Sequence, residues 1–153
     1  MVAGPGIFWV AALKDTTGEL LCTYGSRPEM LSYLLHKKLI DYTAMDIKAP
    51  LEEYSKTVRW QVPVQTLRKG IGLIMHSGIQ YEFRTTVARC LTSKDDLRTI
   101  VRTIKGAKNY YLQRFVSAKL NDPTMTSDPS YSDHELKALA VELGHYVGNC
   151  RVR

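Results

Sequence analysis

The 153-residue chain contains no apolar run of the roughly 20 residues that a membrane-spanning helix needs. It also has few cysteines: Cys22, Cys90 and Cys150 are an odd number at wide spacing. This pattern argues against a disulfide scaffold and favours a reducing compartment. The apolar segment 7–13 has no basic leader before it and no small-residue cleavage site after it, so no secretory signal is expected. We therefore predict a cytoplasmic protein with no membrane partner.

Concentrated positive charge is also missing, although the chain is basic overall. Lysine and arginine number 21 against 15 aspartate and glutamate, yet no basic run exceeds two residues. Nucleic-acid-binding proteins usually carry a clustered basic patch, often with interleaved aromatic residues. We therefore expect no nucleic-acid partner, while the net charge of +6 favours an anionic ligand or protein.

What the sequence does contain is a regular alternation of helix and strand patterns. Apolar residues at helical spacing, with Ser-x-x-Glu capping boxes at Ser26 and Ser132 and a weaker cap at Ser93, predict helices. The predicted helices cover residues 7–15, 26–39, 63–77, 93–105 and 132–147, and the predicted strands 19–23, 41–48, 79–87, 108–116 and 150–153. A polar loop is expected over 117–131. Strands separated by helices imply an α/β fold with parallel pairing.

The predicted strands are polar at every second position. These polar residues are Asp46 and Lys48, then Glu82, Arg84 and Thr86, then Gln113. Strands covered by helices on both faces are nearly all apolar, so one face of this sheet is expected to be polar. A barrel or partial barrel with a polar interior fits this pattern better than a flat, doubly wound sheet.

Candidate binding residues lie on that polar face. Asp46 and Lys48 are two residues apart near the carboxyl end of their strand, where parallel α/β folds place ligands. Glu82 and Arg84 share a face of the next strand. An Asp–Lys pair on an edge strand, or a solvated edge, explains these patterns equally well. The turn 23–26 before a helix could receive an anion, but a simple turn and cap is favoured.

Metal and nucleophile chemistry finds little support in the sequence. The four histidines have no metal-ligand spacing with one another or with cysteine. His76 is expected to be structural, because it precedes the end of a predicted helix. Cys22 and Cys90, at the ends of predicted strands, are interpreted as ordinary buried thiols.

Three segments resemble the activating enzymes of the radical S-adenosylmethionine family, most closely the activase of anaerobic ribonucleoside-triphosphate reductase. Residues 42–50 (YTAMDIKAP) look like its fourth strand, 77–87 (SGIQYEFRTTV) like its fifth and 110–115 (YYLQRF) like its sixth. Segment 120–131 and the last helix also fit, so the resemblance covers about residues 8–153.

The resemblance implies a (β/α)6 partial TIM barrel. In that family a [4Fe-4S] cluster on a CxxxCxxC loop binds S-adenosylmethionine, and its cleavage yields a radical that takes hydrogen from a glycine of the partner glycyl-radical enzyme. By motif match, Lys48 would meet the cofactor's carboxylate beside Asp46, and Arg84 and Gln113 would line the cavity. Thr23, with the two residues after it, would replace the family's Thr-Asn-Gly.

The sequence departs from the family in two respects: it contains neither CxxxCxxC nor the Gly-Gly-Glu segment that holds the methionine amino group. Residues 1–153 are therefore expected to form one domain, the C-terminal part of an incomplete barrel whose first strands are missing. Such a chain would be catalytically inactive alone and would self-associate through an open sheet edge. One alternative is a non-catalytic α/β binding module that keeps the scaffold. Another is a nucleotide-binding domain that uses the helix at Ser26.

Overall fold

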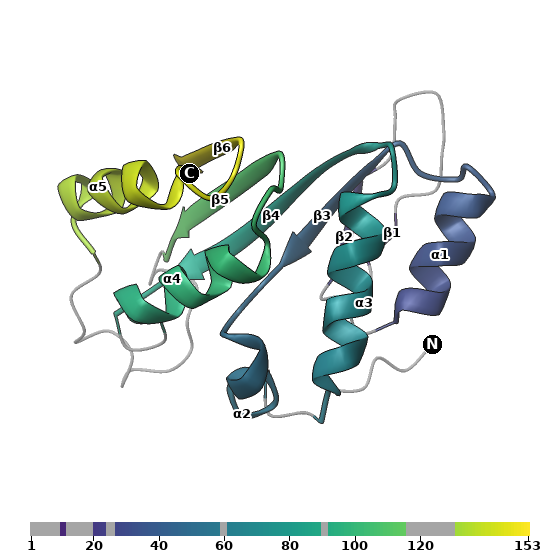
Figure 1. Cartoon of the computed structure of the whole chain (residues 1–153), viewed down its shortest axis with the longest axis horizontal. Coiled ribbons are helices and arrows are strands. Elements are labelled where there is room, and N and C mark those ends of the chain that lie inside the picture. The colour runs from purple at the N-terminus through teal and green to yellow at the C-terminus, as the bar shows by residue number, and fades with distance from the viewer. Residues whose placement is uncertain (1–9, 12–19, 24–26, 59–60, 90–91, 116–130) are drawn as a thin grey trace.

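A single sheet organises the chain. The computed structural model describes residues 10–11, 20–23, 27–58, 61–89, 92–115 and 131–153, with only the backbone described at 10–11 and 20–23 (Figure 1). Its six strands lie side by side in chain order. They are β1 (Val10–Ala11), β2 (Leu20–Thr23), β3 (Tyr42–Asp46), β4 (Gln80–Val87), β5 (Asn109–Arg114) and β6 (Asn149–Val152).

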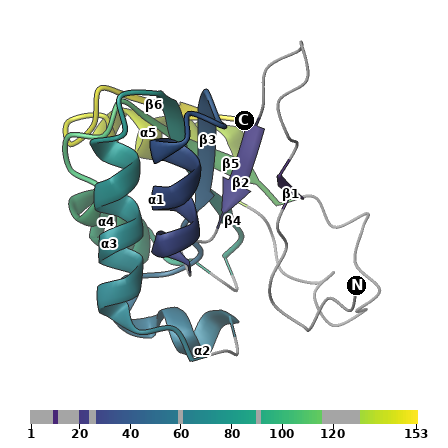
Figure 2. The same cartoon turned by 90° about the vertical axis from the view of Figure 1, so that its right-hand side faces the viewer.

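Helices connect the consecutive parallel strands. Neighbours from β2 to β6 pair in parallel, while β1 pairs with β2 in antiparallel fashion. The connecting helices are α1 (Pro28–His36), α3 (Val64–Met75), α4 (Lys94–Thr103) and α5 (Asp133–Leu143). Figures 1 and 2 show α1, α3 and α4 on the same face of the sheet. The predicted α/β class and its parallel pairing are thus confirmed.

The strand order distinguishes this sheet from a doubly wound one. A doubly wound sheet reverses its strand order at a switch point and carries helices on both faces. Here the order never reverses, as in β/α barrels, where each strand lies beside the next in the chain. The sheet is therefore singly wound, and its closure into part of a barrel stays a prediction.

The core lies between the sheet and the helices. Met45, Phe83 and Leu112 are fully buried on the helix side of β3, β4 and β5. The helices contribute apolar stripes that end in the same cluster, among them Leu67, Ile74, Leu97, Ile100 and Leu139. Burying a side chain of this size contributes about 1.5–3 kcal/mol. This core fixes the sheet and thereby fixes the side chains on its other face.

Two predicted helix starts are confirmed in detail. The Ser93 hydroxyl accepts a hydrogen bond from the Asp96 amide at 3.1 Å, and the Asp96 carboxylate accepts one from the Ser93 amide at 2.8 Å. Ser132 and Glu135 form the same reciprocal pair at the start of α5. The weaker cap expected at Ser93 is therefore a complete capping box, with aspartate in place of the usual glutamate.

The start of α1 differs from its prediction. Ser26 lies outside the described residues, and Arg27 is the N-cap without a side-chain cap bond. Glu29, expected to close a capping box, instead accepts a hydrogen bond from Lys69 on α3 at 3.1 Å. Pro28 lies in the first turn, as the sequence indicates, because proline needs no amide partner there.

The helix predicted over 7–15 is wrong where the structure describes it. Val10 and Ala11 form β1, in register with Cys22 and Leu21 of β2. Apolar and β-branched residues suit an extended edge strand, and pairing satisfies the amides on that edge of β2. The rest of 7–15 lies outside the described residues, as does nearly all of the polar loop predicted over 117–131.

A short helical segment after β3 was not predicted. It consists of η1 (Leu51–Glu53) and α2 (Tyr54–Val58), and it lies beyond the carboxyl end of β3 (Figure 1). Leu51 and Tyr54 are buried, and the Tyr54 hydroxyl donates to the Asp46 carbonyl oxygen at 3.1 Å. The segment thus fixes the end of β3.

Candidate functional site

Alternate residues of the strands form the face of the sheet opposite the helices, which we call the polar face. Its described members are Tyr42, Ala44 and Asp46 of β3; Gln80, Glu82, Arg84 and Thr86 of β4; Asn109, Tyr111 and Gln113 of β5; and Asn149 and Arg151 of β6. All but Ala44 are polar. The alternation expected from the sequence is therefore present on neighbouring strands.

The register brings two predicted site residues into contact. Asp46 and Arg84 are paired across β3 and β4. The Arg84 Nε donates to Asp46 Oδ1 at 2.7 Å, and the two side chains are only 15% and 24% exposed. A charge-assisted bond of this length is among the stronger polar contacts in proteins. It lies at the carboxyl end of β3, where parallel sheets present ligand-binding groups.

A second charged group lies next to this pair. The Glu82 side chain is only 4% exposed, and its Oε1 accepts a hydrogen bond from Arg153 Nη1 at 2.9 Å. Arg84 Nη1 is 3.9 Å from the same oxygen. The Arg153 guanidinium also stacks 3.9 Å from the ring centroid of Tyr111. Two carboxylates and two guanidiniums therefore alternate across β3, β4 and the residue after β6.

Tyr42 completes this arrangement. Burial, and then its hydrogen bond to the Glu82 carboxylate, raise the Tyr42 pKa well above its usual range. The hydroxyl, which is protonated at neutral pH, acts as a donor to Glu82.

The remaining predicted site residues lie around this network. Lys48 is half-buried two residues beyond β3, and Gln113 is half-buried on β5 in register with Thr86. Thr23 is the last residue of β2, in register with Met45, and only its backbone is described. The turn 24–26 and Cys90 lie outside the described residues. The structure thus joins Asp46 directly to Arg84 and leaves the ligand roles of all five residues as predictions.

Sequence reasoning missed Arg153, Tyr111 and Tyr42. Tyr42 and Tyr111 share the polar face with Asp46 and Gln113 by the same period of two, so this signal was available. Arg153 lies after the last strand, and its reach to Glu82 on β4 follows from a register that the sequence does not reveal.

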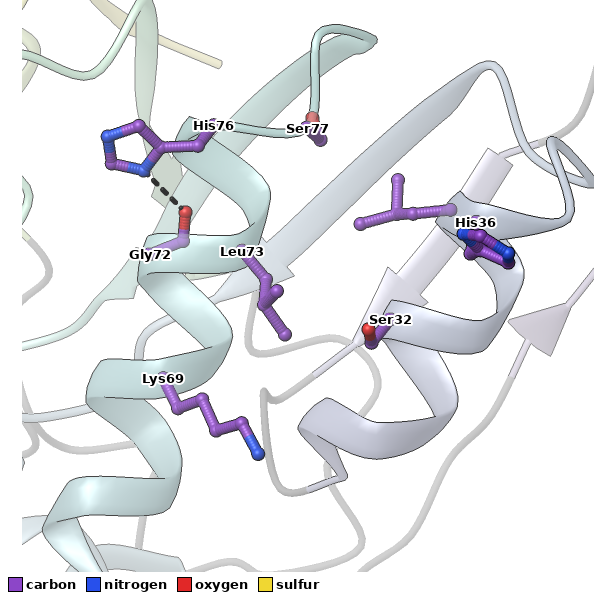
Figure 3. Close-up of a pocket in the computed structure, with 8 residues that line it drawn as sticks. Ser32, His36, Lys69, Gly72, Leu73, His76 and Ser77 are labelled. Carbon is purple, nitrogen blue, oxygen red and sulfur yellow. Dashed lines mark hydrogen bonds between the residues drawn. The ribbon is translucent and has the colours of Figure 1, made fainter.

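A groove on the opposite side of the molecule is not part of this site. It has a volume of about 530 Å³ and lies between α1 and α3, with Ser32, His36 and Leu73 among its lining residues (Figure 3). The His76 ring lies 2.8 Å from the Gly72 carbonyl oxygen at the end of α3. This contact agrees with the structural role predicted for His76.

The described residues do not fit an iron–sulfur cluster. Within the described ranges, no three His, Cys, Asp or Glu residues are grouped so that they could hold a metal ion. Cys22 is in register with Ala44 on β3, and Cys150 with Tyr110 on β5. Four strand spacings separate β2 from β6, about 19 Å in a sheet. Cluster ligands must converge on one cube, so these two thiols cannot share one.

Together these features define a singly wound α/β protein with a half-buried charged network on the polar face of its sheet, which reaches the carboxyl end of β3 at Asp46. Across the described part of the chain, no helix combines the length and apolar character needed to span a bilayer.

Among curated proteins, the chain is similar to one from Methanocaldococcus jannaschii named "Putative glycyl-radical enzyme activating enzyme MJ1227". The two are 27% identical over 135 residues, which make up 86% of this chain and 56% of that protein. The chain therefore spans about half the length of this curated relative. No protein-family model matches it.

Proposed function

We propose that this chain is the S-adenosylmethionine-binding part of a radical activase that acts on a glycyl-radical enzyme. The observation that carries the proposal is the similarity over 135 residues to a protein with an activase name. The residues that resemble activase strands by motif are also those that form β3, β4 and β5. The consecutive parallel order of these strands further supports it, since a partial TIM barrel requires that order.

In this proposal the ligand is bound and oriented by Asp46, Arg84 and Gln113 of the polar face, together with Lys48 and Thr23 beside the carboxyl ends of β3 and β2. The Lys48 ammonium contacts the methionine carboxylate as a charge-assisted hydrogen bond. Arg84, held by Asp46, and Gln113 line the cavity, and Thr23 approaches the ligand from β2. No step is assigned to the cluster, because the three cysteines form no CxxxCxxC motif and the two that the structure places, Cys22 and Cys150, lie on strands β2 and β6. In a complete activase the cluster supplies the electron that cleaves the cofactor.

The finer assignments are also proposals. Motif resemblance favours anaerobic ribonucleoside-triphosphate reductase as the glycyl-radical partner. The absence of CxxxCxxC from these 153 residues leads us to expect no activity from the chain alone. We also propose a cytoplasmic location, which agrees with a ribonucleotide reductase as the partner.

Titration calorimetry of the full chain tests the proposal by comparing S-adenosylmethionine with 5′-methylthioadenosine. The second compound lacks the carboxylate and the charged sulfur, so it lacks the group expected to meet Lys48. We expect S-adenosylmethionine to bind weakly and methylthioadenosine to bind at least about tenfold more weakly still. Equal affinities, or no binding of either compound, would contradict the proposed site.

A non-catalytic α/β binding module is the second candidate function. The absence of a CxxxCxxC motif from these 153 residues favours it. The sequence of the gene upstream of Met1 separates the two candidates. A CxxxCxxC motif there, in the same reading frame, supports the activase, whereas an independent promoter directly before Met1 supports the binding module.

A further inference from the structure

Glu82 is the most deeply buried charged group on the described polar face. Only 4% of its side chain is exposed, although the other face of the sheet is the one that packs against the helices. An isolated carboxylate at such a position is strongly unfavourable, so Glu82 requires cationic partners, and these determine where neighbouring charges lie.

Two guanidiniums lie within reach of Glu82. Arg153 donates to Oε1 at 2.9 Å, whereas Arg84 lies 3.9 Å from the same oxygen and donates instead to Asp46 at 2.7 Å. Arg153 is also held by its stacking on Tyr111. Both arginines are therefore close enough to pair with Glu82, but the hydrogen bond to Glu82 comes from Arg153. Arg84 is hydrogen-bonded to Asp46.

We infer that Arg153 is a positioning residue, which neutralises Glu82 and thereby keeps Arg84 on Asp46 at the carboxyl end of β3. Without Arg153, Arg84 is the described guanidinium that remains beside Glu82, and it turns toward that carboxylate. This movement withdraws the Arg84 charge from the ligand end of the sheet. The consequence for the ligand rests on the proposed function. The claim that Arg153 keeps Arg84 bonded to Asp46 does not depend on it.

The direct test observes Arg84 in the full chain without any ligand. Its Nε–Hε signal in a ¹⁵N nuclear magnetic resonance spectrum is assigned by its loss in Arg84→Lys. In Arg153→Ala we expect this signal to shift and its hydrogen exchange to accelerate about tenfold, as for loss of a charge-assisted bond. Arg153→Gln should give the same result. It replaces Arg153→Ala in the measurement if the alanine variant fails to fold.

Two further variants separate positioning from general destabilisation. Arg151→Ala is the matched control, because Arg151 is an exposed arginine of β6 whose guanidinium donates to Asn149 on its own strand. It should leave the Arg84 signal unchanged. The double variant Arg153→Ala with Glu82→Gln removes the competing carboxylate, so Arg84 should return to Asp46 and recover the parental signal. An unchanged signal in both single Arg153 variants, or no recovery in the double variant, overturns the inference.

The same proteins then report on the ligand. If S-adenosylmethionine binds the parent, Arg153→Ala should weaken its binding about tenfold, and the double variant should restore it to within about threefold. If the parent binds none, the proposed function fails while the Arg84 signal still decides the role of Arg153.

Discussion

Arg84 and Asp46 face each other across β4 and β3, and their 2.7 Å bond is largely sheltered from solvent. Removing the charge of one member of a sheltered pair costs free energy, because a charge-assisted hydrogen bond is lost in a place that water reaches poorly. We predict that Asp46→Asn lowers the free energy of unfolding by about 1–3 kcal/mol, measured by urea denaturation. Glu52→Gln is the control, because its pair with Arg68 is half exposed and such pairs contribute at most about 1 kcal/mol. Equal losses in the two variants would contradict a special role for the Asp46 pair.

The two capping boxes predict a local effect on stability. Ser93→Ala and Ser132→Ala each remove a hydroxyl that accepts from a helix amide, and each should cost about 1 kcal/mol. Ser32→Ala, at an exposed interior position of α1, should be neutral or slightly stabilising because alanine is the better helix former. Urea denaturation of the three variants checks this. A neutral Ser132→Ala would mean that the α5 cap does not hold in solution.

Stability should fall on acidification, in part through Glu135. The Ser132 amide, the Arg89 guanidinium and the Ser132 hydroxyl lower the Glu135 pKa to about 2. A lowered pKa stabilises the fold above the ordinary carboxyl range, and that contribution disappears as pH falls toward about 2. Glu135→Gln should therefore lose less stability between pH 5 and pH 2 than the parent, whereas exposed Glu53→Gln should follow the parent. Parallel curves for Glu135→Gln and the parent would contradict the assignment.

Lys48 is predicted to recognise the ligand carboxylate. Lys48→Ala should weaken S-adenosylmethionine binding by about ten- to a hundredfold, as loss of a charge-assisted hydrogen bond implies. Lys56→Ala is the control, since Lys56 is exposed on α2 near the same end of the sheet. Calorimetry on the full chain, or on a fusion of this chain to the N-terminal segment of an activase, measures both. Equal affinities for Lys48→Ala and its parent would remove Lys48 from the site.

The 153-residue chain should bind no [4Fe-4S] cluster by itself. Its three cysteines do not form a CxxxCxxC motif, and Cys22 and Cys150 lie on strands β2 and β6. Anaerobic reconstitution, gel filtration and iron and sulfide analysis test this. Stable incorporation of four irons per chain would contradict it.

Local patterns predicted most of the elements because local physics determines them. The spacing of apolar residues and the capping residues predicted α3, α4 and α5. The alternation of polar and apolar residues predicted β3 and β4 and their polar face. The two failures have tertiary causes. Val10 and Ala11 become a strand because β2 offers them an edge. The segment from Leu51 to Val58 becomes helical because Leu51 and Tyr54 find a buried position beyond β3.

For the candidate site, the sequence could predict which residues of one strand share a face, but not which residues of different strands meet. A period of two places Glu82 with Arg84 and Asp46 with Lys48, but it does not say which strand lies beside which residue. The bond from Arg84 to Asp46 depends on the β3–β4 register, and the contact of Arg153 with Glu82 depends on two further registers. The single-sequence patterns contain no such information between strands.

The consecutive strand order makes this architecture modular. Because each strand pairs only with its neighbours in the chain, a further strand–helix unit can be gained or lost at an edge without rethreading the rest. The registers from β3 to β6, and the charged network they create, do not depend on what lies beyond β2. A lineage of such proteins can therefore vary in length by whole units while the registers of the retained strands, and the face they build, stay constant.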